Sequence, residues 1–211
     1  MFTGLIETLG TLGRMTRRGN YLVLQIDAGF SDEPIHIGES VCCDGACLTV
    51  TSARDSVFTV DVSQESLSRT IASGYRIGAK INLERALKAG DRFGGHMVSG
   101  HIDDIGTVEH ARRIGDSIEL AVVFDSRYDD FVVEKGSVAI NGVSLTVNDV
   151  GGGRLTVNVI PLTAQMTNLG ETKKGDKVNL EFDMIGKYIA KMTDKGENTN
   201  LTIEKLRESG W

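Results

Sequence analysis

The sequence contains little proline, little cysteine and no long apolar run. Of its 211 residues, 2 are proline and 3 are cysteine. The cysteines, Cys42, Cys43 and Cys47, lie too close together to form a disulfide framework. No stretch predicts a membrane span, and the first residues, MFTGLIETLG, lack the basic start and apolar core of a signal peptide. These absences predict a cytoplasmic protein without a membrane partner.

Charge and residue spacing exclude further classes of site. The formal net charge is -6 and no basic stripe is present, so we expect no nucleic-acid partner. The 4 histidines show no HxxxH or similar pairing, and the clustered cysteines lack further zinc ligands at a suitable spacing. No GxGxxG motif follows a predicted strand, which argues against a nicotinamide or flavin oxidoreductase. We therefore expect neither a metal nor a bound cofactor.

Glycine is abundant, with 25 residues, and the chain is internally duplicated. Four blocks repeat in the same order at an offset of 96 or 97 positions. The repeated blocks are 1–12 with 97–108, 40–51 with 137–148, 59–62 with 156–159, and 78–84 with 175–181. Such a repeat predicts two copies of one domain, which we assign to residues 1–90 and 97–183. The Gly-rich polar stretch 87–95 is typical of a boundary between domains.

Both copies alternate apolar and polar residues over short segments separated by glycine-containing turns. This period of two predicts strands at 48–53, 58–63 and 80–84, and at 145–150, 155–160 and 177–181. Many short strands favour a barrel or a sandwich, and we expect two small antiparallel barrels because closure removes the exposed sheet edge. One short helix is expected in each copy, at 63–73 with Ser63 as its cap and at 161–169.

After the repeat, an apolar stripe follows at helical spacing. It predicts a helix that packs either on its own barrel or, as we favour, on another subunit. The stripe consists of Met184, Ile185, Tyr188, Ile189 and Met192. A second short helix, capped by Thr199 or Asn200, would carry Leu201, Ile203 and Leu206.

Four motifs resemble those of riboflavin synthases of the two-barrel type. MFTGLIE opens the first copy, DGACLTVT lies within it, GGHMVSGHID opens the second copy and NGVSLTV follows. The resemblance implies an all-β fold of two tandem homologous six-stranded antiparallel Greek-key β-barrels plus a C-terminal α-helix within 184–211. It also implies a homotrimer, with each productive site between the first barrel of one subunit and the second barrel of its neighbour.

The same resemblance implies a transferase reaction at the last step of riboflavin synthesis. Two molecules of 6,7-dimethyl-8-ribityllumazine bind face to face, and one gives a four-carbon unit to the other. The products are riboflavin and 5-amino-6-(D-ribitylamino)uracil. The alternatives are a non-catalytic lumazine- or flavin-binding protein of the same fold, and an unrelated two-barrel domain without a ligand. Retention of Cys47, Ser40 and His101 argues against the first, and the specific duplicated motifs argue against the second.

Three residues are the expected catalytic groups: Cys47, His101 and Ser40. Cys47 matches Ser144 and His101 matches Leu5, so each copy carries one of the two most reactive groups, and facing barrels would bring them together. The nucleophile at C7 of the acceptor lumazine is Cys47, Ser40 or water; alternatively, Cys47 is a small buried hydrophobic residue. His101 is expected to take a proton from the C7 methyl group or to orient a water, unless it is a structural turn residue.

The remaining residues carried over from the family are expected to bind ring edges and ribityl hydroxyls. Asp183 is equally suited to cap a helix. The stretch 160–165 departs from the family, because Leu162 stands where a polar or acidic residue is usual. Cys42, Cys43 and His96 are expected to be structural. The expected binding residues are Gly4, Leu5, Ile6, Leu48, Thr49, Asp61 and Ser66 in the first copy, and Gly100, Ile102, Lys135, Ser144, Leu145, Thr146, Ile160, Thr163 and Asp183 in or just after the second.

Overall fold

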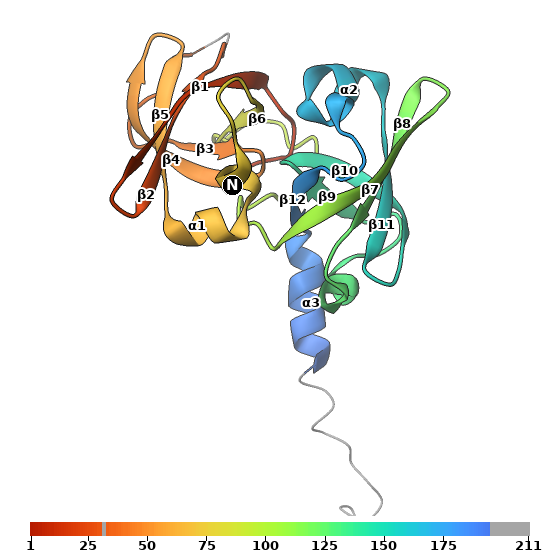
Figure 1. Cartoon of the computed structure of the whole chain (residues 1–211). Coiled ribbons are helices and arrows are strands. Elements are labelled where there is room, and N and C mark those ends of the chain that lie inside the picture. Colours follow the sequence, from red (N-terminus) through yellow and green to blue (C-terminus); the bar gives the residue numbers. More distant parts are fainter. Residues whose placement is uncertain (31–32, 195–211) are drawn as a thin grey trace, which may run out of the picture.

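The computed structural model describes residues 1–30 and 33–194 and contains two closed barrels side by side (Figure 1). The first barrel has the strand order β1-β2-β5-β4-β3-β6, with every pair antiparallel. Its strands are β1 (Thr8–Arg18), β2 (Tyr21–Asp27), β3 (Ser40–Cys43), β4 (Ala46–Arg54), β5 (Val57–Val62) and β6 (Lys80–Arg85).

The second barrel repeats this arrangement. Its closed order, β10-β11-β8-β7-β12-β9, is the first order read in the other direction. Its strands are β7 (Asp104–Ile114), β8 (Ser117–Val123), β9 (Ser137–Ile140), β10 (Val143–Val150), β11 (Arg154–Val159) and β12 (Lys177–Phe182). The expectation of two six-stranded antiparallel barrels is therefore confirmed.

Alternating side chains fill each barrel. On β5, Phe58, Val60 and Val62 are buried, while the residues between them are partly exposed. Because successive side chains of a strand point to opposite faces, this pattern directs one face of β5 into the core. Full burial of one such side chain contributes about 1.5–3 kcal/mol. Each barrel has its own cluster of buried apolar residues, so each has an independent core.

Short helices connect or follow the strands. The first copy carries α1 (Gln64–Arg69) and the 3-10 helix η1 (Ile71–Gly74); the second carries η2 (Ser126–Phe131), α2 (Pro161–Met166) and η3 (Asn168–Glu171). The Ser63 side chain accepts a hydrogen bond from the Ser66 backbone N–H, which confirms it as the cap of α1. The expected helical segments are thus present, each continued by a 3-10 turn.

A further helix, α3 (Met184–Asp194), follows β12 and extends below both barrels in Figure 1. It confirms the helix predicted from the apolar stripe. The second helix expected from Thr199 or Asn200 lies outside the described residues. Within the described ranges, no helix is long and apolar enough to cross a membrane.

The β3–β4 hairpin and its counterpart, the β9–β10 hairpin, meet between the barrels. Asp44 and Gly45 turn the first hairpin with φ of 46° and 87°, and Asn141 and Gly142 turn the second with 46° and 78°. Positive φ at both central residues is typical of type I′ turns, which suit Asn-Gly and Asp-Gly sequences. A Cβ atom on Gly45 would lie 2.9 Å from the backbone nitrogen of Gly142, so the two turns pack with no room for a side chain.

A buried polar cluster surrounds Asp44 at this contact. Its carboxylate accepts hydrogen bonds from the Tyr75 hydroxyl (2.7 Å), the Asn82 backbone N–H (2.8 Å) and the Asn168 amide (2.8 Å). The Asn179 side chain donates to the Asp44 carbonyl at 2.7 Å, which ties β12 to the first barrel. Burial raises the pKa of Asp44 to about 6, although these donors act in the opposite direction. The cluster therefore joins the barrels through polar contacts.

The raised pKa of Asp44 predicts a pH-dependent stability. Between about pH 4 and pH 6 the folded protein retains a proton that the unfolded chain has released, so this stabilisation is lost as the pH rises. Asp44→Asn reproduces the second copy's Asn141 and removes this titration. As the pH rises from 4 to 7, its free energy of unfolding should increase by about 3 kcal/mol relative to that of wild type. Urea unfolding at each pH measures this difference. The exposed Asp55→Asn variant is the control, and parallel wild-type and Asp44→Asn curves would contradict the account.

Candidate functional site

The segments that precede the two barrels each cross to the opposite barrel. Phe2 and Val98 pair in an antiparallel bridge, with N–H···O distances of 2.8 and 3.2 Å. Beyond this bridge, Ile6 packs against the core of the second barrel and Ile102 against the core of the first. The sequence places Gly4, Leu5 and Ile6 in the first copy, yet the structure places Gly4 and Ile6 on the second barrel. This exchange was not anticipated from the sequence.

Each crossing segment contacts the strand that carries the expected reactive position. The Cys47 N–H donates to the Gly100 carbonyl at 2.8 Å, and the Ser144 N–H donates to the Gly4 carbonyl at 2.8 Å. A Cβ atom on Gly100 would lie 2.4 Å from the Cβ of Cys47, and one on Gly4 would lie 2.6 Å from the Cβ of Ser144. Both glycines also have positive φ, so these positions require glycine for two reasons.

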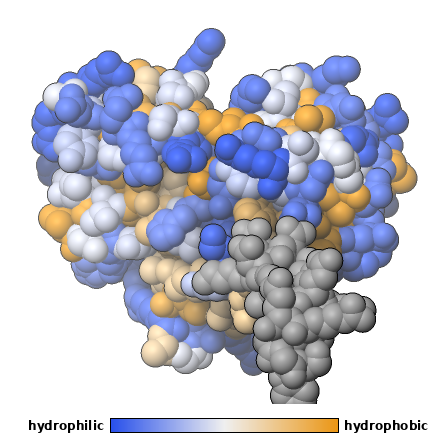
Figure 2. Space-filling model, turned by 90° about the horizontal axis from the view of Figure 1, so that it is seen from below, coloured by the Kyte–Doolittle hydropathy of each residue, from blue (hydrophilic) through white to orange (hydrophobic). Residues whose placement is uncertain are grey.

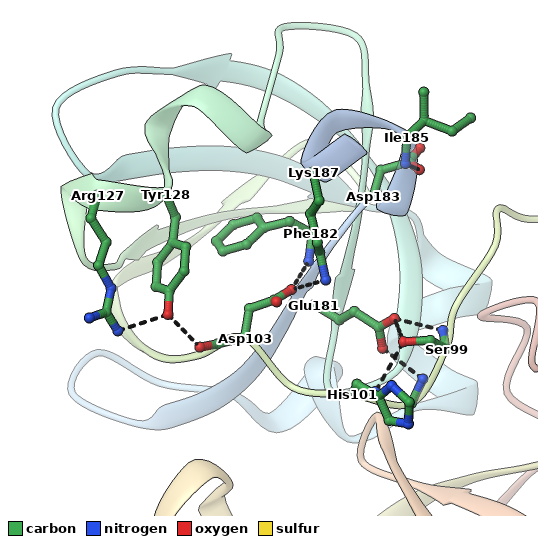
Figure 3. Close-up of polar contacts among 11 residues, drawn as sticks. Ser99, His101, Asp103, Arg127, Tyr128, Glu181, Phe182, Asp183, Ile185 and Lys187 are labelled. Carbon is green, nitrogen blue, oxygen red and sulfur yellow. Dashed lines mark hydrogen bonds and ion pairs between the residues drawn. The ribbon is translucent and has the colours of Figure 1, made fainter. Parts of the chain in front are cut away.

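Two equivalent glutamates hold the crossing segments. Glu84 on β6 accepts from the Thr3 N–H (2.6 Å), the Thr3 hydroxyl (2.7 Å) and the Gly4 N–H (3.0 Å). Glu181 on β12 accepts from the N–H and hydroxyl of Ser99 (2.6 Å each) and the Gly100 N–H (2.9 Å), as Figure 3 shows. Burial raises the pKa of both carboxyls, although these hydrogen bonds oppose it. In both copies, a glutamate carboxylate that accepts three hydrogen bonds thus anchors the crossing segment.

The first candidate binding surface, called the first pocket below, combines β3 and β4 with the segment from the second copy. Ser40 and Thr49 are cross-strand partners, and partly exposed Cys47 faces Cys42, which is buried. Because the Cys47 N–H is hydrogen-bonded to the Gly100 carbonyl, the segment that carries the exposed His101 lies next to Cys47 within one chain. Facing barrels of two subunits are therefore not needed to bring the cysteine and histidine segments together.

The other expected first-copy residues are distributed around this pocket. Asp61 on β5 forms an ion pair with Arg18 at 2.6 Å, and the Ser66 hydroxyl lies 3.0 Å from that of Ser63 at the start of α1. The side chain of Leu48 is buried in the first core, so only its backbone is available to a ligand there. Buried Cys42 and Cys43 agree with a structural role, and burial raises the pKa of both thiols.

The second pocket is built from the equivalent strands and differs in its chemistry. Ser144 and the exposed Thr146 lie on β10, while Leu145 is buried in the core. Exposed Lys135 has a φ of 64°, in the left-handed region that non-glycine residues rarely adopt. The first copy has Gly38 at this position. Gly38 also has a positive φ, of 91°, so the two copies share this turn geometry and the conformation of Lys135 follows from the turn.

The segment around α2 borders the same barrel. Ile160 and Leu162 are exposed, and Thr163 is partly buried, with its carbonyl accepting from the Thr167 hydroxyl at 2.7 Å. The segment therefore presents the apolar side chains of Ile160 and Leu162 at the surface.

Asp183 caps α3, as the alternative interpretation of the sequence proposed. Its carboxylate accepts from the Ile185 N–H at 3.0 Å (Figure 3). One turn later, Lys187 pairs with Asp103 at 2.5 Å, and Asp103 also accepts from the Phe182 N–H at 2.8 Å. These contacts fix the first turn of α3 to the second barrel.

His96 forms a contact that sequence reasoning missed. Its Nδ1 lies 2.7 Å from the Ser144 hydroxyl, whereas the sequence suggested only a structural role. Its backbone N–H also donates to the Thr3 carbonyl at 3.1 Å. Burial lowers the pKa of the imidazole, with an opposing contribution from Asp183, so His96 is neutral near pH 7.

One chain does not enclose the candidate site. None of the five main hollows in the part of the chain that the structure describes is lined by Cys47, His101 or Ser144. Ser40 lines one of these hollows and Leu5 another. Among the same described residues, no group of three or more His, Cys, Asp or Glu side chains is arranged to hold a metal ion. Cys47 and Ser144 are partly exposed and His101 is exposed.

Comparisons with known proteins agree on fold and family. A family model described as the lumazine binding domain matches residues 3–86 and again residues 99–183. The riboflavin synthase of Actinobacillus pleuropneumoniae is 38% identical over 215 residues, and that of Bacillus subtilis (strain 168) is 39% identical over 215; both alignments cover 100% of each chain.

Solved structures with the same fold include two complexes of LumP. The complex with riboflavin matches with a TM-score of 0.78 and the complex with 6,7-dimethyl-8-(1'-D-ribityl) lumazine with 0.76. Each is 22% identical to this chain and covers 86% of it and 99% of the LumP chain. At this identity the similarity establishes the fold.

Proposed function

Because this chain belongs to the riboflavin synthase family, an enzyme family, we propose that it converts two molecules of 6,7-dimethyl-8-ribityllumazine into riboflavin and 5-amino-6-(D-ribitylamino)uracil. The reaction is a group transfer: one lumazine gives up C6 and C7 with their methyl groups, and the other gains these four carbons. The observation that supports this proposal most strongly is the pair of homologous pockets, because two identical substrates need two similar sites. Holding both rings in contact makes the bimolecular step effectively unimolecular.

The differences between the pockets suit a reaction in which identical molecules take opposite roles. The first pocket presents Cys47 beside the segment that carries His101, and the second presents Ser144 beside the segment that carries Leu5. In this proposal, Cys47 or a water held near Ser40 adds at C7 of the acceptor lumazine. A thiol or a bound water needs a nearby base to take its proton before it can act as a nucleophile, and histidine is the side chain that most often serves as that base. His101 is therefore proposed to accept the proton from the C7 methyl group or from that water.

We further propose a homotrimer in which the first pocket of one subunit faces the second pocket of its neighbour. Ile185, Tyr188, Ile189 and Met192 on α3 are between 57% and 74% exposed, although all four are apolar. Figure 2 views this end of the molecule and shows apolar side chains gathered there. Exposed apolar surface of this extent is typical of an interface. The open candidate pockets also gain a cover when a neighbouring barrel faces them.

A cytoplasmic location completes the proposal. All three cysteines are free thiols, and two of them are buried. Proteins with several unpaired cysteines are typical of reducing compartments.

The reaction needs no metal or bound cofactor, because both the carbon donor and the carbon acceptor are substrate molecules.

The test is incubation of the purified protein with 6,7-dimethyl-8-ribityllumazine in the presence of a chelator. The proposal predicts catalytic formation of riboflavin, with one pyrimidine product for each riboflavin and two lumazines consumed. Binding without product would instead favour a lumazine-binding protein that lacks catalysis. Neither binding nor product would refute both functions and leave only the fold.

Cys47→Ser tests the role of the thiol. Turnover should fall about tenfold or more, because a hydroxyl is a far weaker nucleophile than a thiolate at neutral pH. The dissociation constant for riboflavin should change by less than about threefold, since the serine Oγ takes the place of the cysteine Sγ and is similar to it in size. Stopped-flow absorbance and fluorescence titration measure the two quantities. If turnover is unchanged, Cys47 has no part in the chemistry.

A further inference from the structure

The second pocket contains a histidine–serine pair that the first pocket lacks. His96 is 7% exposed, and its Nδ1 lies 2.7 Å from the Ser144 hydroxyl oxygen. In the first pocket, Cys47 occupies the position of Ser144, and no histidine within the described residues is hydrogen-bonded to it. The two pockets therefore differ in the partner of their central side chain as well as in its identity.

The surroundings of Ser144 restrict how its hydroxyl can move. Its backbone N–H is bonded to Gly4, and a Cβ atom added to either Gly4 or Gly95 would lie within 3.1 Å of the Ser144 Cβ. The crossing segment and the His96 loop thus pack closely on this residue. These contacts hold the backbone and Cβ of Ser144, and its hydroxyl is hydrogen-bonded to the imidazole, so this contact decides which role the hydroxyl plays.

The second ring nitrogen of His96 indicates which way the hydrogen bond runs. Nε2 is buried and has no hydrogen-bond partner among the described residues. A neutral imidazole carries one N–H, either on Nε2 or on Nδ1. Placing it on Nε2 would leave a buried N–H donor unpaired, whereas placing it on Nδ1 leaves a single unpaired acceptor at Nε2. Among buried backbone groups, an orphaned N–H is the rarer of these two outcomes in folded proteins. The geometry therefore favours the proton on Nδ1, facing Ser144.

We propose that His96 is a positioning residue: its Nδ1–H donates to the Ser144 oxygen, and the Ser144 hydroxyl is thereby committed to donate its own hydrogen to the molecule in the second pocket. The inference rests on the proposed function for the identity of that molecule. Ser144 then hydrogen-bonds a carbonyl oxygen, a ring nitrogen or the negative charge that develops there. With one of its two lone pairs accepting from His96, the Ser144 hydroxyl keeps its hydrogen for the bound molecule, while Cys47 remains the nucleophilic candidate in the other pocket.

Nitrogen-15 NMR of the full chain tests the direction of the hydrogen bond without any ligand. The His96 ring signals are assigned by their loss in His96→Gln. The expected spectrum shows a protonated Nδ1 and an unprotonated Nε2 near pH 7, and the same pattern in the presence of riboflavin. Protonation at Nε2, or a mixture of both tautomers, would overturn the inference.

Variants test whether His96 acts through Ser144. The amide nitrogen of Asn lies as many bonds from Cα as Nδ1, so His96→Asn should keep the donor, whereas His96→Leu removes it. His96→Leu should weaken riboflavin binding about tenfold, the effect of one lost hydrogen bond to a ligand, while His96→Asn stays within about threefold. In a Ser144→Ala background, His96→Leu should have no further effect on binding. Because contacting residues couple and independent ones add, a full additional loss in that background would overturn the positioning role.

Two further readouts separate this role from simple structural support. The pH dependence of turnover should keep its inflections in His96→Asn, because a neutral His96 contributes no titration near pH 7. Thermal unfolding of each variant shows whether the fold is retained. If wild type itself binds no riboflavin, the proposed function and the ligand half of this inference both fail, and the NMR spectrum still decides the tautomer.

Discussion

Replacing Gly100 with alanine is expected to reduce riboflavin formation more than about a hundredfold and to destabilise the chain by several kcal/mol. The new Cβ would lie 2.4 Å from the Cβ of Cys47, and its backbone φ of 85° is strained for any residue with a side chain. Relief requires the segment that carries His101 and Ile102 to leave the first barrel. The expected nucleophile and base would then separate, and the Cys47 N–H would lose its acceptor.

Gly115 provides the matched control for this substitution. It has a φ of 61°, but a Cβ atom there would meet nothing within 4 Å. Gly115→Ala therefore carries the backbone strain without the collision and should cost about 1 kcal/mol with unchanged turnover. Urea unfolding and the riboflavin assay on both variants separate the two effects. Equal behaviour of the two variants would show that the contact between Gly100 and Cys47 has no importance for the site.

Charging the apolar face of α3 should convert the protein into monomers with little activity. In the proposed trimer, Tyr188→Glu combined with Ile189→Glu places two carboxylates in an apolar interface, at a cost of several kcal/mol for each buried charge. Deletion of residues 187–211 should have the same result. The double variant is the cleaner test, because it leaves the ion pair between Lys187 and Asp103 in place. Sedimentation velocity measures the mass, and the riboflavin assay measures turnover.

Lys191→Glu is the control for the helix variant, because it changes charge at a position that is already polar and exposed. It should leave both mass and turnover unchanged. A fully active monomer from the double variant would contradict a site shared between subunits. A trimer that persists in the double variant would show that the apolar face of α3 is not the interface.

The barrels could be predicted from the sequence because their causes are local. The alternation of apolar and polar residues in the sequences of β5, β6 and β12 and the cap at Ser63 are read within a few residues. Burial follows this alternation on β5, whereas polar residues within β6 and β12 are buried as well. The duplication then transferred every prediction from one copy to the other. The apolar stripe likewise predicted α3, since helical periodicity needs no knowledge of distant residues. The same stripe could not show which surface covers the helix, because that depends on a partner.

The exchange of the crossing segments could not be predicted in the same way. Alignment by copy assigns Gly4 and Ile6 to the first barrel, whereas contacts with residues more than a hundred positions away place them on the second. A signal was nevertheless present in the sequence. Both copies have a glycine near the start, Gly4 and Gly100, and a glutamate in the last strand, Glu84 and Glu181. The hairpins of each copy do not need these residues. The pairing of His96 with Ser144 also depends on this exchange, which is why His96 was interpreted as a structural residue.

The most direct test of a site built from two subunits uses the equivalent exposed residues Thr49 and Thr146. Thr49→Trp should fill the first pocket and Thr146→Trp the second, so each variant alone should be inactive. Co-expressed chains would form mixed trimers, in which about a quarter of the interfaces join two intact pockets. The account predicts recovery of up to about a quarter of wild-type riboflavin formation in the mixture. No recovery in mixed trimers, although each variant is folded and trimeric, would contradict it and place both pockets of the reaction within one chain.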